Sequence, residues 1–439
     1  MRLRMLRKIG ILGHYGNGNL GDEAIVAAVI QSVKRHAPDA TVVGFCVNPV
    51  DTAQRHGIQA FRIRRVVSAP PVGGAGGSQA ATTSGEQRSW RESTKQIIKS
   101  IPLLNSLAKL IWHLPRTLHT IWREGCFLVT ASRTLTGIDL LIVAGSGQLM
   151  DGFGGAWAFP YTLFKWSVMA RLRKTKLAIL SVGAGPINAP LSRFFLRQAL
   201  RLAHYRSFRD DYSMSLIKSL GVKKADNVFP DLACNLVLGH ADVVPTENRS
   251  RVVGIIPVPY YDHRYWQKSD PVKYTDFVQK LAQFSLWLLD RGFVVSPFWT
   301  KLYTDELVVK DIEKVIKSSN VNQASEGLLS RQISTLDDVI RAMGECDMLV
   351  ASRFHGILLP LLMQKPVIGL AYHPKTNDMM TYMGQPDYCL SIDDFTVEGL
   401  QRMFLQMEER VPIIRSTLKP QALKAAALVE EQYRRVISL

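Results

Sequence analysis

The stretch IGILGHYGNGNLGDEA, residues 9–24, joins a short apolar run to the start of a helix through a glycine-rich loop. Its glycines repeat the spacing G-x-G-x-x-G: Gly16, Gly18 and Gly21. In dinucleotide-binding proteins this spacing lets a pyrophosphate rest on the free N–H groups at a helix N-terminus. Here Asp22 and Glu23 follow the last glycine directly. Two carboxylates in the first turn suit the helix dipole themselves and repel a pyrophosphate.

The end of the second apolar run, residues 41–47, also argues against a dinucleotide site. A ribose-binding acid would be expected there, but Asn48 occupies the position. We therefore interpret the glycine loop as a polar, flexible segment at the mouth of a cleft, in which Asn17 and Asn19 contact substrate. Asp22 would act either as the N-cap of the following helix or as a hydrogen-bond acceptor.

The composition is that of a globular protein with anionic partners. The chain has 439 residues, 47% hydrophobic and 21% charged, a length that favours two domains. Its 54 basic and 37 acidic residues give a net charge of +17, which points to phosphates, acidic sugars or a membrane surface. No nucleic-acid-binding module is recognisable, so we expect no nucleic-acid partner. The five cysteines are scattered without a C-x-x-C pair, so we expect neither a disulfide framework nor a metal site.

The first residues, MRLRMLRKIGIL (1–12), are basic but lead directly into an apolar strand. They lack the apolar region and cleavage site of a signal peptide. No stretch reaches the roughly 18–20 unbroken apolar residues that a membrane-spanning helix needs. We therefore expect a cytoplasmic protein, whose contact with the inner membrane face would be peripheral.

Short apolar runs alternate with helical stretches, a pattern typical of parallel sheets covered by helices on both faces. The apolar runs are residues 9–12, 41–47, 139–145, 177–185, 205–208, 251–259, 292–299, 348–352 and 366–372. Helices are predicted near residues 22–36, 160–174, 191–203, 273–291, 304–318, 336–344 and from His355 onward. We expect an α/β fold of two Rossmann-like domains facing across a cleft, residues 1–245 and 246–418, joined by a polar link at 241–250. A charged amphipathic helix over 419–439 would follow.

An insert at residues 66–137 interrupts the first domain. Residues 68–89 are rich in Gly, Ser, Ala and Pro, and we predict that they are disordered. Residues 95–130 instead interleave apolar and tryptophan residues with five Lys or Arg, and Glu124 is the only acid. Two interpretations stay open: an interfacial helix pair on anionic lipid, or a basic-faced helical lid on the domain.

A second informative stretch is LVASRFHGILLP, residues 349–360, in which an apolar strand ends at Ser352. Three residues follow at the strand-to-helix turn: Arg353, Phe354 and His355. A guanidinium, an imidazole and free helix N–H groups thus meet at one point, which suits a small ligand carrying a phosphate and a carboxylate. The alternative is that Arg353 only pairs with an acid and that His355 only caps the helix.

Other strand ends offer further groups for the same ligand. Lys375, in AYHPKTND (371–378), either adds charge to this pocket or is solvated. Arg209 follows a strand of the first domain, and we expect it to face Arg353 across the cleft and close a clamp on an anion. Asp231 would either bond a hydroxyl or an arginine, or belong to a structural turn.

These pieces, in this order, resemble the polysaccharide pyruvyl transferase family. The resemblance rests on three segments and covers nearly the whole chain outside the insert: GNGNLGDEAI, RSFRDDYS with the later LGV, and SRFHGILLPLLMQKPVIGLAYHPK. Its most specific element is the Ser-Arg-x-His-Gly turn, where Phe354 replaces the leucine that the family usually carries. The glycine-rich strand end of the family's first domain is present as AGSGQLMDGFGG, residues 144–155.

The resemblance implies a GT-B-like fold and the transfer of pyruvate from phosphoenolpyruvate to two hydroxyls of a sugar, which forms a cyclic ketal. Arg209 and Arg353 would hold the phosphate and carboxylate of this donor, with His355, Phe354 and Lys375 beside them. Some relatives act on lipid-linked oligosaccharides at the cytoplasmic membrane face, which would give the basic insert a role. Phosphoenolpyruvate would be a substrate, and no metal or other cofactor is expected.

The residues fit this chemistry, because ketal formation needs a proton on the methylene carbon and a clamp for the departing phosphate. We hypothesise that His355 is the acid or base and that the two arginines hold the donor. The base that activates the acceptor stays open among three candidates: Asp22, His14 and Asp231.

Two other functions stay open. One is a nucleotide-sugar glycosyltransferase of the same architecture, although the sequence shows neither its Arg/Lys pair with a later Glu nor a D-x-D motif. The other is a non-catalytic, membrane-associated polysaccharide assembly factor, against which the complete set of Arg209, Arg353 and His355 argues. The absence of Walker-type, H-E-x-x-H and G-x-S-x-G motifs gives ATPase, zinc-protease and hydrolase functions no support.

Overall fold

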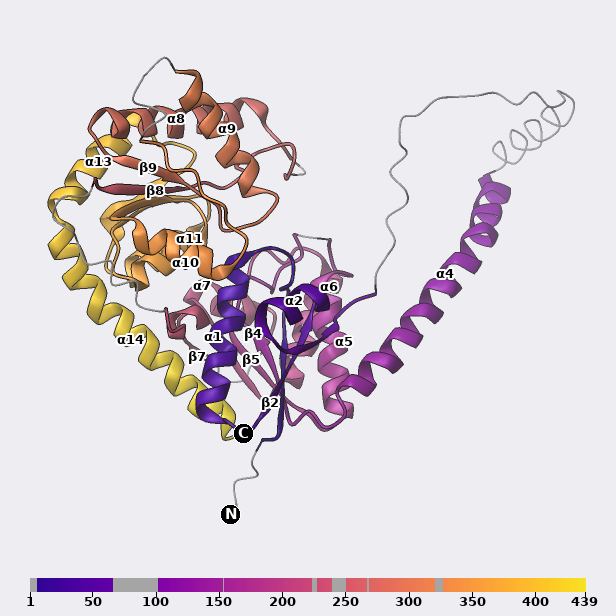
Figure 1. Ribbon diagram of the computed structural model, residues 1–439. Coiled ribbons are helices and arrows are strands. Elements are labelled where there is room, and N and C mark those ends of the chain that lie inside the picture. Colours follow the sequence, from indigo (N-terminus) through magenta and orange to yellow (C-terminus); the bar gives the residue numbers. More distant parts are fainter. Residues whose placement is uncertain are drawn as a thin grey trace, which may run out of the picture. The chain divides into compact units, whose positions relative to one another are not determined.

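The computed structural model in Figure 1 describes residues 6–65, 102–152, 154–222, 227–238, 250–266, 268–319 and 327–439. The chain forms two compact units, one made of residues 1–62 and 137–439 and the other of residues 63–136. The larger unit contains two parallel β-sheets. The segment predicted to be disordered, 68–89, and nearly all of the predicted link at 241–250 lie outside the described residues.

Seven parallel strands form the first sheet, in the order β3-β2-β1-β4-β5-β6-β7. Their bounds are β1 Lys8–Leu12, β2 Thr41–Cys46, β3 Gln59–Arg62, β4 Leu140–Ala144, β5 Lys176–Val182, β6 Tyr205–Phe208 and β7 Asn227–Val228. The strand order reverses at β1, which pairs with both β2 and β4. In open α/β sheets, ligands bind outside the carboxyl ends of the strands at such a reversal.

Two helix layers cover this sheet. The strand residue Ile11 packs in the core beneath α1, whereas Phe45 points to the other face, where its ring lies 4.9 Å from that of Trp166 on α5. Helices α5 and α6 pack side by side (Figure 1). The helices of this half are α1 Leu20–His36, α2 Pro49–His56, α5 Phe159–Leu172, α6 Pro190–Leu202 and α7 Asp211–Ser219. Because both faces are covered, the central strands are almost entirely apolar.

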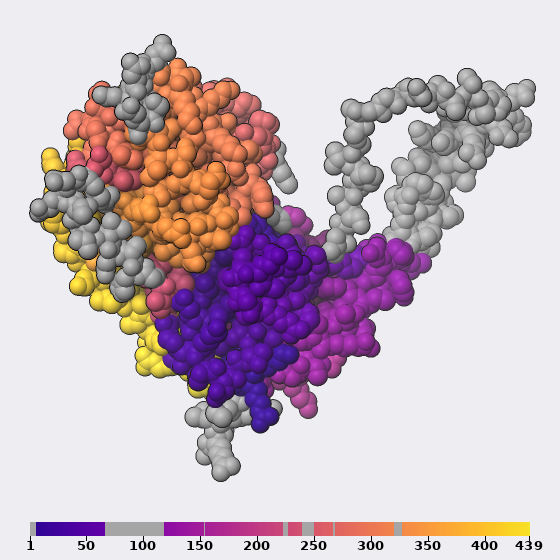
Figure 2. All heavy atoms as spheres, in the orientation of Figure 1, coloured from indigo at the N-terminus to yellow at the C-terminus, as the bar shows by residue number. Residues whose placement is uncertain are grey.

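Five parallel strands form the second sheet, in the order β12-β11-β10-β8-β9. The strands are β8 Val252–Ile256, β9 Val294–Pro297, β10 Met348–Ala351, β11 Val367–Ala371 and β12 Cys389–Ser391. The helices that follow them are α8 Pro271–Asp290, α9 Asp305–Ser318, α10 Leu336–Glu345, α11 Phe354–Leu362, α12 Pro374–Tyr382 and α13 Val397–Glu409. In Figure 2 the indigo surface of the N-terminal residues and the orange surface of this half meet directly.

A long helix, α14 (Val411–Ile437), connects the layers of the two sheets. It packs against α11 and α13 of the second half and against α1 and the short 3-10 helix η1 (Leu232–Asn235) of the first. Near its end the buried amide of Gln432 donates to the Ser207 hydroxyl at 2.7 Å and lies 3.3 Å from the Ser181 hydroxyl. The helix therefore fixes the C-terminal end of the chain to strands β5 and β6.

The smaller unit contains one continuous helix, α4 (Pro102–Thr134), so the predicted helix pair at 95–130 is wrong for the described part of that segment. No glycine-rich or polar turn divides these residues, which explains the single helix. Large apolar side chains are exposed along it: Leu118, Ile121, Trp122 and Val129. In the part of the chain that the structure describes, no helix is both long and apolar enough to cross a bilayer.

The predicted strands and helices of both sheets are confirmed, and two helix starts need correction. The first helix begins at Leu20 because Asn19 is its N-cap, so the prediction that Asp22 caps it is wrong. The C-terminal helix begins at Val411, eight residues before the predicted start at 419, because Pro412 in its first turn favours helix initiation. The short strands β3 and β12 were missed, since they have four and three residues, none of them buried, and carry too little pattern.

Replacing Gln432 by Leu tests the connection between α14 and the first sheet. The change leaves the hydroxyls of Ser181 and Ser207 without their amide partner in a buried setting, so we expect the free energy of unfolding to fall by about 1–3 kcal/mol. Urea denaturation followed by circular dichroism measures it. The control is Arg434→Ala on the exposed side of α14, expected to change stability by less than about 0.5 kcal/mol. Equal stabilities of the two variants would contradict this account.

Candidate active site

The glycine loop between β1 and α1 is fixed by bonds from both halves of the larger unit. Gly16 and Gly18 have φ angles of 76° and 75°, in the left-handed region where glycine is favoured. Leu20 N–H donates to the carbonyl of Thr300 at 2.9 Å, and Leu302 N–H donates to the carbonyl of Gly18 at 2.8 Å. These two backbone bonds hold the carboxyl ends of the first sheet against the loop that follows β9.

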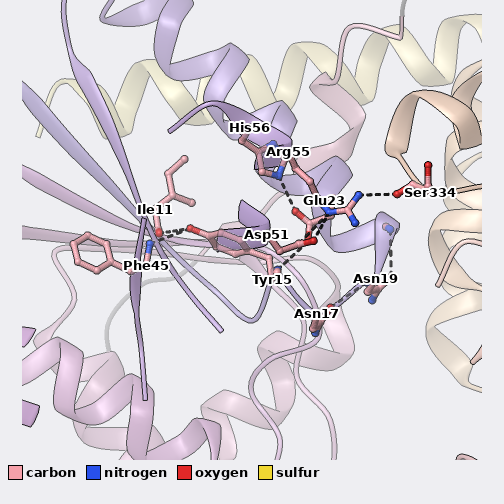
Figure 3. Close-up of polar contacts among 12 residues, drawn as sticks. Ile11, Tyr15, Asn17, Asn19, Glu23, Phe45, Asp51, Arg55, His56 and Ser334 are labelled. Carbon is pink, nitrogen blue, oxygen red and sulfur yellow. Dashed lines mark hydrogen bonds and ion pairs between the residues drawn. The ribbon is translucent and has the colours of Figure 1, made fainter. Parts of the chain in front are cut away.

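Buried polar side chains also hold the same loop (Figure 3). The carboxylate of Glu23, 1% exposed, accepts from Gly16 N–H at 2.9 Å and lies 2.7 Å from Nε2 of His56. The Tyr15 hydroxyl donates to the Ile11 carbonyl at 2.6 Å. Glu23 thus takes the N–H group that a bound pyrophosphate would need, which supports the exclusion of a dinucleotide site.

The two asparagines predicted to contact substrate also have local partners in the loop. The Asn19 side chain accepts from Gly21 N–H at 3.2 Å and donates to Asp22 at 2.7 Å. The Asn17 amide accepts from Asn19 N–H at 3.1 Å, and its nitrogen lies 2.8 Å from Nδ1 of His14. Both asparagines therefore shape the loop in this structure.

The third glycine of the motif makes room for an imidazole from the other sheet. A Cβ atom at Gly21 would lie 2.5 Å from Nδ1 of His355 and 2.8 Å from its Cβ and Cγ atoms. His355 is 9% exposed and stands in the first turn of α11, directly after β10. Gly21 is required because the histidine ring passes close over the start of α1.

His355 and Arg209 converge on Asp231, which is 4% exposed. Nε2 of His355 lies 3.6 Å from one carboxylate oxygen, and Nη1 of Arg209 donates to the other at 3.1 Å. Burial alone would raise the pKa of Asp231, but His355 and Arg209 outweigh it and hold this pKa well below its usual range. Asp231 caps η1, three residues after the strand that it was predicted to end.

Arg209 is enclosed by groups from both sheets. The ring of Phe354 lies under its guanidinium at 4.3 Å, and a Cβ atom at Gly183 would lie 2.6 Å from Nη2. Asp210, whose carboxylate is 3.6 Å from Nε, caps α7 as predicted for this position. The stacking aligns a cation with an aromatic face, an attraction that strengthens out of water.

Arg353 is paired to a buried acid. Its Nε donates to Asp305 at 2.9 Å, and Nη2 bonds the second carboxylate oxygen, a two-point contact at the start of α9. Asp305 is fully buried. Arg353 therefore pairs with an acid, and the same pair fixes the guanidinium at the strand end.

Lys375 joins the two arginines in one site. Burial, followed by the positive charges of Arg209 and Arg353, lowers the pKa of Lys375 to about 8, against the opposing charges of Asp22 and Asp210. Lys375 is thus not a solvated surface lysine. Three cations from three strand ends act on one another here, an arrangement that an anion would stabilise.

Asp22 is the other acid facing His355. It accepts from the hydroxyl of Ser146 at 2.8 Å, and Ser146 has a φ of 64°, a strained left-handed backbone. Burial raises the pKa of Asp22, while the charge of His355 and the Ser146 bond oppose the shift. In this structure the Asp22 carboxylate thus accepts hydrogen bonds from Ser146 and Asn19 and does not cap α1.

Three contributors to the site were not predicted: Asp305, Gly183 and Ser146. Asp305 is 48 residues from its partner, so no local spacing could indicate the pair. Gly183 lies in SVGAG, at the end of a predicted strand. The available signal was a glycine at a strand end.

Comparisons with known proteins give first the class of fold. The structure is similar to UDP-GlcNAc 2-epimerase from Neisseria meningitidis, with 12% identity, a TM-score of 0.57 and coverage of 98% of this chain and 99% of that one. It is also similar to sucrose-phosphate synthase from Thermosynechococcus elongatus, with 11% identity, a TM-score of 0.52 and 98% coverage of both chains. The protein therefore has a GT-B fold, two Rossmann-like halves built on parallel sheets.

The family follows from the sequence comparison. The family model described as polysaccharide pyruvyl transferase matches residues 19–374, and the chain belongs to this family. A search among curated proteins gave no match.

Replacing Gly21 by Ala tests the close approach of His355 to α1. Overpacking of this kind costs about 1–3 kcal/mol, so we expect Gly21→Ala to lower the free energy of unfolding by that amount. In a His355→Gly background both the ring and the Cβ atom are gone, and most of the cost of Gly21→Ala should disappear. Urea denaturation of the four proteins measures this coupling. Gly152→Ala, where a Cβ meets open space, is the control, and additive effects of the two site changes would contradict the contact.

Replacing Lys375 by Met tests whether the three cations form an anion site. We expect inorganic phosphate to bind at least about tenfold more weakly, while the free energy of unfolding at pH 7 rises by about 1–2 kcal/mol, because a desolvated cation beside two others is removed. Calorimetric titration and urea denaturation measure the two effects. A structural lysine would instead lose stability without affecting phosphate.

The same lysine sets the expected pH dependence. Its folded pKa of about 8 lies below its unfolded value, so the unfolded chain binds more protons between these values and the wild type gains stability as the pH rises through that window. Phosphate affinity should fall over the same window, whereas Lys375→Arg, which stays charged, should keep it.

Proposed function

We propose that this protein transfers the pyruvyl group of phosphoenolpyruvate to two hydroxyls of a sugar in an exopolysaccharide or its lipid-linked precursor, forming a cyclic ketal. The observation that carries the proposal is the group of three cations, Arg209, Arg353 and Lys375, at the strand ends of a family member. A donor with a phosphate and a carboxylate supplies the negative charges that these cations lack.

Each arginine has a carboxylate partner that fixes its orientation. Asp231 orients Arg209, and Asp305 orients Arg353 through two bonds. Lys375 has no carboxylate of this kind among its described hydrogen bonds and ion pairs, and an anion beside it would offset the burial and the like charges that lower its pKa. We assign the donor phosphate and carboxylate to this cluster.

The transfer begins with a proton on the methylene carbon of phosphoenolpyruvate, which becomes a methyl group. The cation formed at C2 is attacked by one sugar hydroxyl, which loses its proton. The C2–oxygen bond to phosphate then breaks, and the second hydroxyl attacks C2 and loses its proton. One phosphate is released for each ketal. Of the two protons that the hydroxyls lose, one replaces the proton delivered to the methylene carbon and the other leaves with the phosphate.

Two carboxylates with pKa values displaced in opposite directions flank His355, which suggests the proton carriers. Asp231 stays ionised and lies 3.6 Å from Nε2 of His355, and we assign His355 as the acid for the methylene carbon. Asp22 has a raised pKa, which brings it closer to neutral pH, and we assign it as the base for a sugar hydroxyl. Asp231 is then a positioning residue.

We include the α4 surface in this proposal as a contact with the anionic inner membrane face. Leu118, Ile121, Trp122 and Val129 recur at helical spacing and are exposed. Arg123 and Arg133 lie on the same helix, and its acid Glu124 pairs with Arg65 at 3.0 Å. Such a surface would bring the enzyme to a lipid-linked acceptor.

Replacing His355 by Ala, or Arg353 by Lys, tests the reaction. General acid catalysis contributes about 10²–10⁴-fold, and we expect His355→Ala to lower phosphate release from phosphoenolpyruvate by that factor. Arg353→Lys should weaken donor binding, because a lysine cannot keep the two-point contact with Asp305. The assay uses the lipid-linked saccharide fraction of producing cells that lack this gene. Mass spectrometry should find each product heavier by one pyruvic acid less one water.

The control is His263→Ala, an exposed histidine of the same half, which should retain wild-type turnover. Near-wild-type turnover of either site variant would contradict the assigned roles. Stabilisation by nucleotide sugars and not by phosphoenolpyruvate in thermal unfolding would instead support a glycosyltransferase. Folded protein that releases no phosphate with any acceptor would support an assembly factor.

A further inference from the structure

One long segment of the first half carries no acidic residue. Residues 152–209 contain ten Lys or Arg and no Asp or Glu. The segment includes α5, β5 and α6, so ten of the chain's 54 basic residues fall in this part of the first half. The acid that precedes it, Asp151, is engaged by the backbone N–H groups of Asn188 and Ala189, at 2.9 and 2.8 Å.

The same layer exposes aromatic side chains. Trp157 is 67% exposed and Phe194 49% exposed, unusual values for large apolar residues. The Trp157 ring lies 5.2 Å from that of Tyr161, and the Phe194 ring lies 6.2 Å from that of Phe164. Leu191 extends the surface along the first turn of α6. These five residues form an aromatic surface across α5 and α6.

Exposed basic side chains border the aromatic surface. Arg193 lies beside Phe194 on α6, and Arg201 lies on the same helix two turns later. At the far end of α5, Arg171 and Lys174 are exposed together with Leu172, which is 76% exposed. Helices α5 and α6, which carry these cations and apolar groups, pack side by side (Figure 1).

The aromatic surface lies at the site's edge of the sheet. Helix α5 follows β4 and α6 follows β5, so the first turns of both helices stand at the carboxyl ends of the strands. Ser146, which contacts Asp22, follows β4, and Gly183, which admits Arg209, follows β5. A partner held on this surface would therefore be close to the strand ends that build the site.

We propose that the aromatic surface of α5 and α6, with Arg193 and Arg201, binds an anionic lipid bilayer. Aromatic rings with polar edges settle at the headgroup level, and arginines bind lipid phosphates while their stems cover apolar surface. A second copy of this chain is a poor occupant, because it would bring the same acid-free layer against itself. The purpose of this contact, which would bring the enzyme to a lipid-linked acceptor, rests on the proposed function. The lipid contact itself does not depend on the proposed function.

Flotation of the full chain with vesicles tests the proposal. We expect binding to vesicles of equal parts phosphatidylglycerol and phosphatidylcholine, and little to phosphatidylcholine alone. Two double variants should each weaken binding by about tenfold or more. One is Trp157→Ser with Phe194→Ser, and the other is Arg193→Glu with Arg201→Glu. The matched controls are Ile413→Ser with Leu423→Ser, exposed on α14, and Arg402→Glu on α13, which should bind as the wild type does. All variants should keep the thermal shift given by phosphoenolpyruvate.

Several outcomes would overturn the inference. Equal binding of the wild type to both vesicle types would contradict recognition of anionic lipid. If the Trp157/Phe194 variant binds as the wild type does, while Ile121→Ser with Trp122→Ser on α4 abolishes binding, the aromatic surface does not contact the bilayer. A dimer in lipid-free sedimentation that the Trp157/Phe194 variant abolishes would identify the partner as a second copy. Failure of the proposed function is seen separately, as a wild type that binds vesicles but gains no stability from phosphoenolpyruvate.

Discussion

The site depends on three neighbouring positive charges, those of Arg209, Arg353 and Lys375, each of them only partly exposed to water. Like charges in a low-dielectric setting repel strongly, and the chain offsets this for the two arginines with Asp231 and Asp305. Lys375 bears the remaining cost, which is visible in its lowered pKa. The anion of the proposed reaction would relieve this repulsion on entering the site. A protein with such a site is less stable without its ligand than one with a neutral site would be. This is the usual trade-off between function and stability.

Close backbone approaches allow the two sheets to share this site. Gly21 lets His355 of the second half lie over the first turn of α1, and Gly183 lets Arg209 lie against β5. The backbone bonds between the glycine loop and residues 300–302 keep these approaches in register. A glycine motif known from nucleotide binding thus has another physical use here, because Glu23 already occupies the N–H group of Gly16. The motif supplies room for side chains rather than donors for a phosphate.

The sequence predicted what local pattern determines. Apolar runs between helices gave both sheets, and the residues at strand ends, Arg209, Arg353 and His355, could be proposed because carboxyl ends of parallel strands converge. Pairings across long separations could not be predicted: Asp305 gives no local sign of binding Arg353. Whether Asp22 caps α1 stayed open in the sequence because Asn19 and Asp22 both suit a helix start, and only the backbone shows which one precedes it.

Charge distribution links the site to the surface around it. The acid-free segment 152–209 ends at Arg209 itself, so the layer that carries the exposed aromatic residues also delivers one of the three site cations. Its positive field extends from α5 and α6 to the strand ends, and acts in the same direction on an anionic donor and on an anionic bilayer. Selection for either ligand would remove Asp and Glu from this layer. The two ligands would nevertheless respond differently to salt, because exposed charges are screened over about 8 Å at physiological ionic strength and the buried cluster is screened much less.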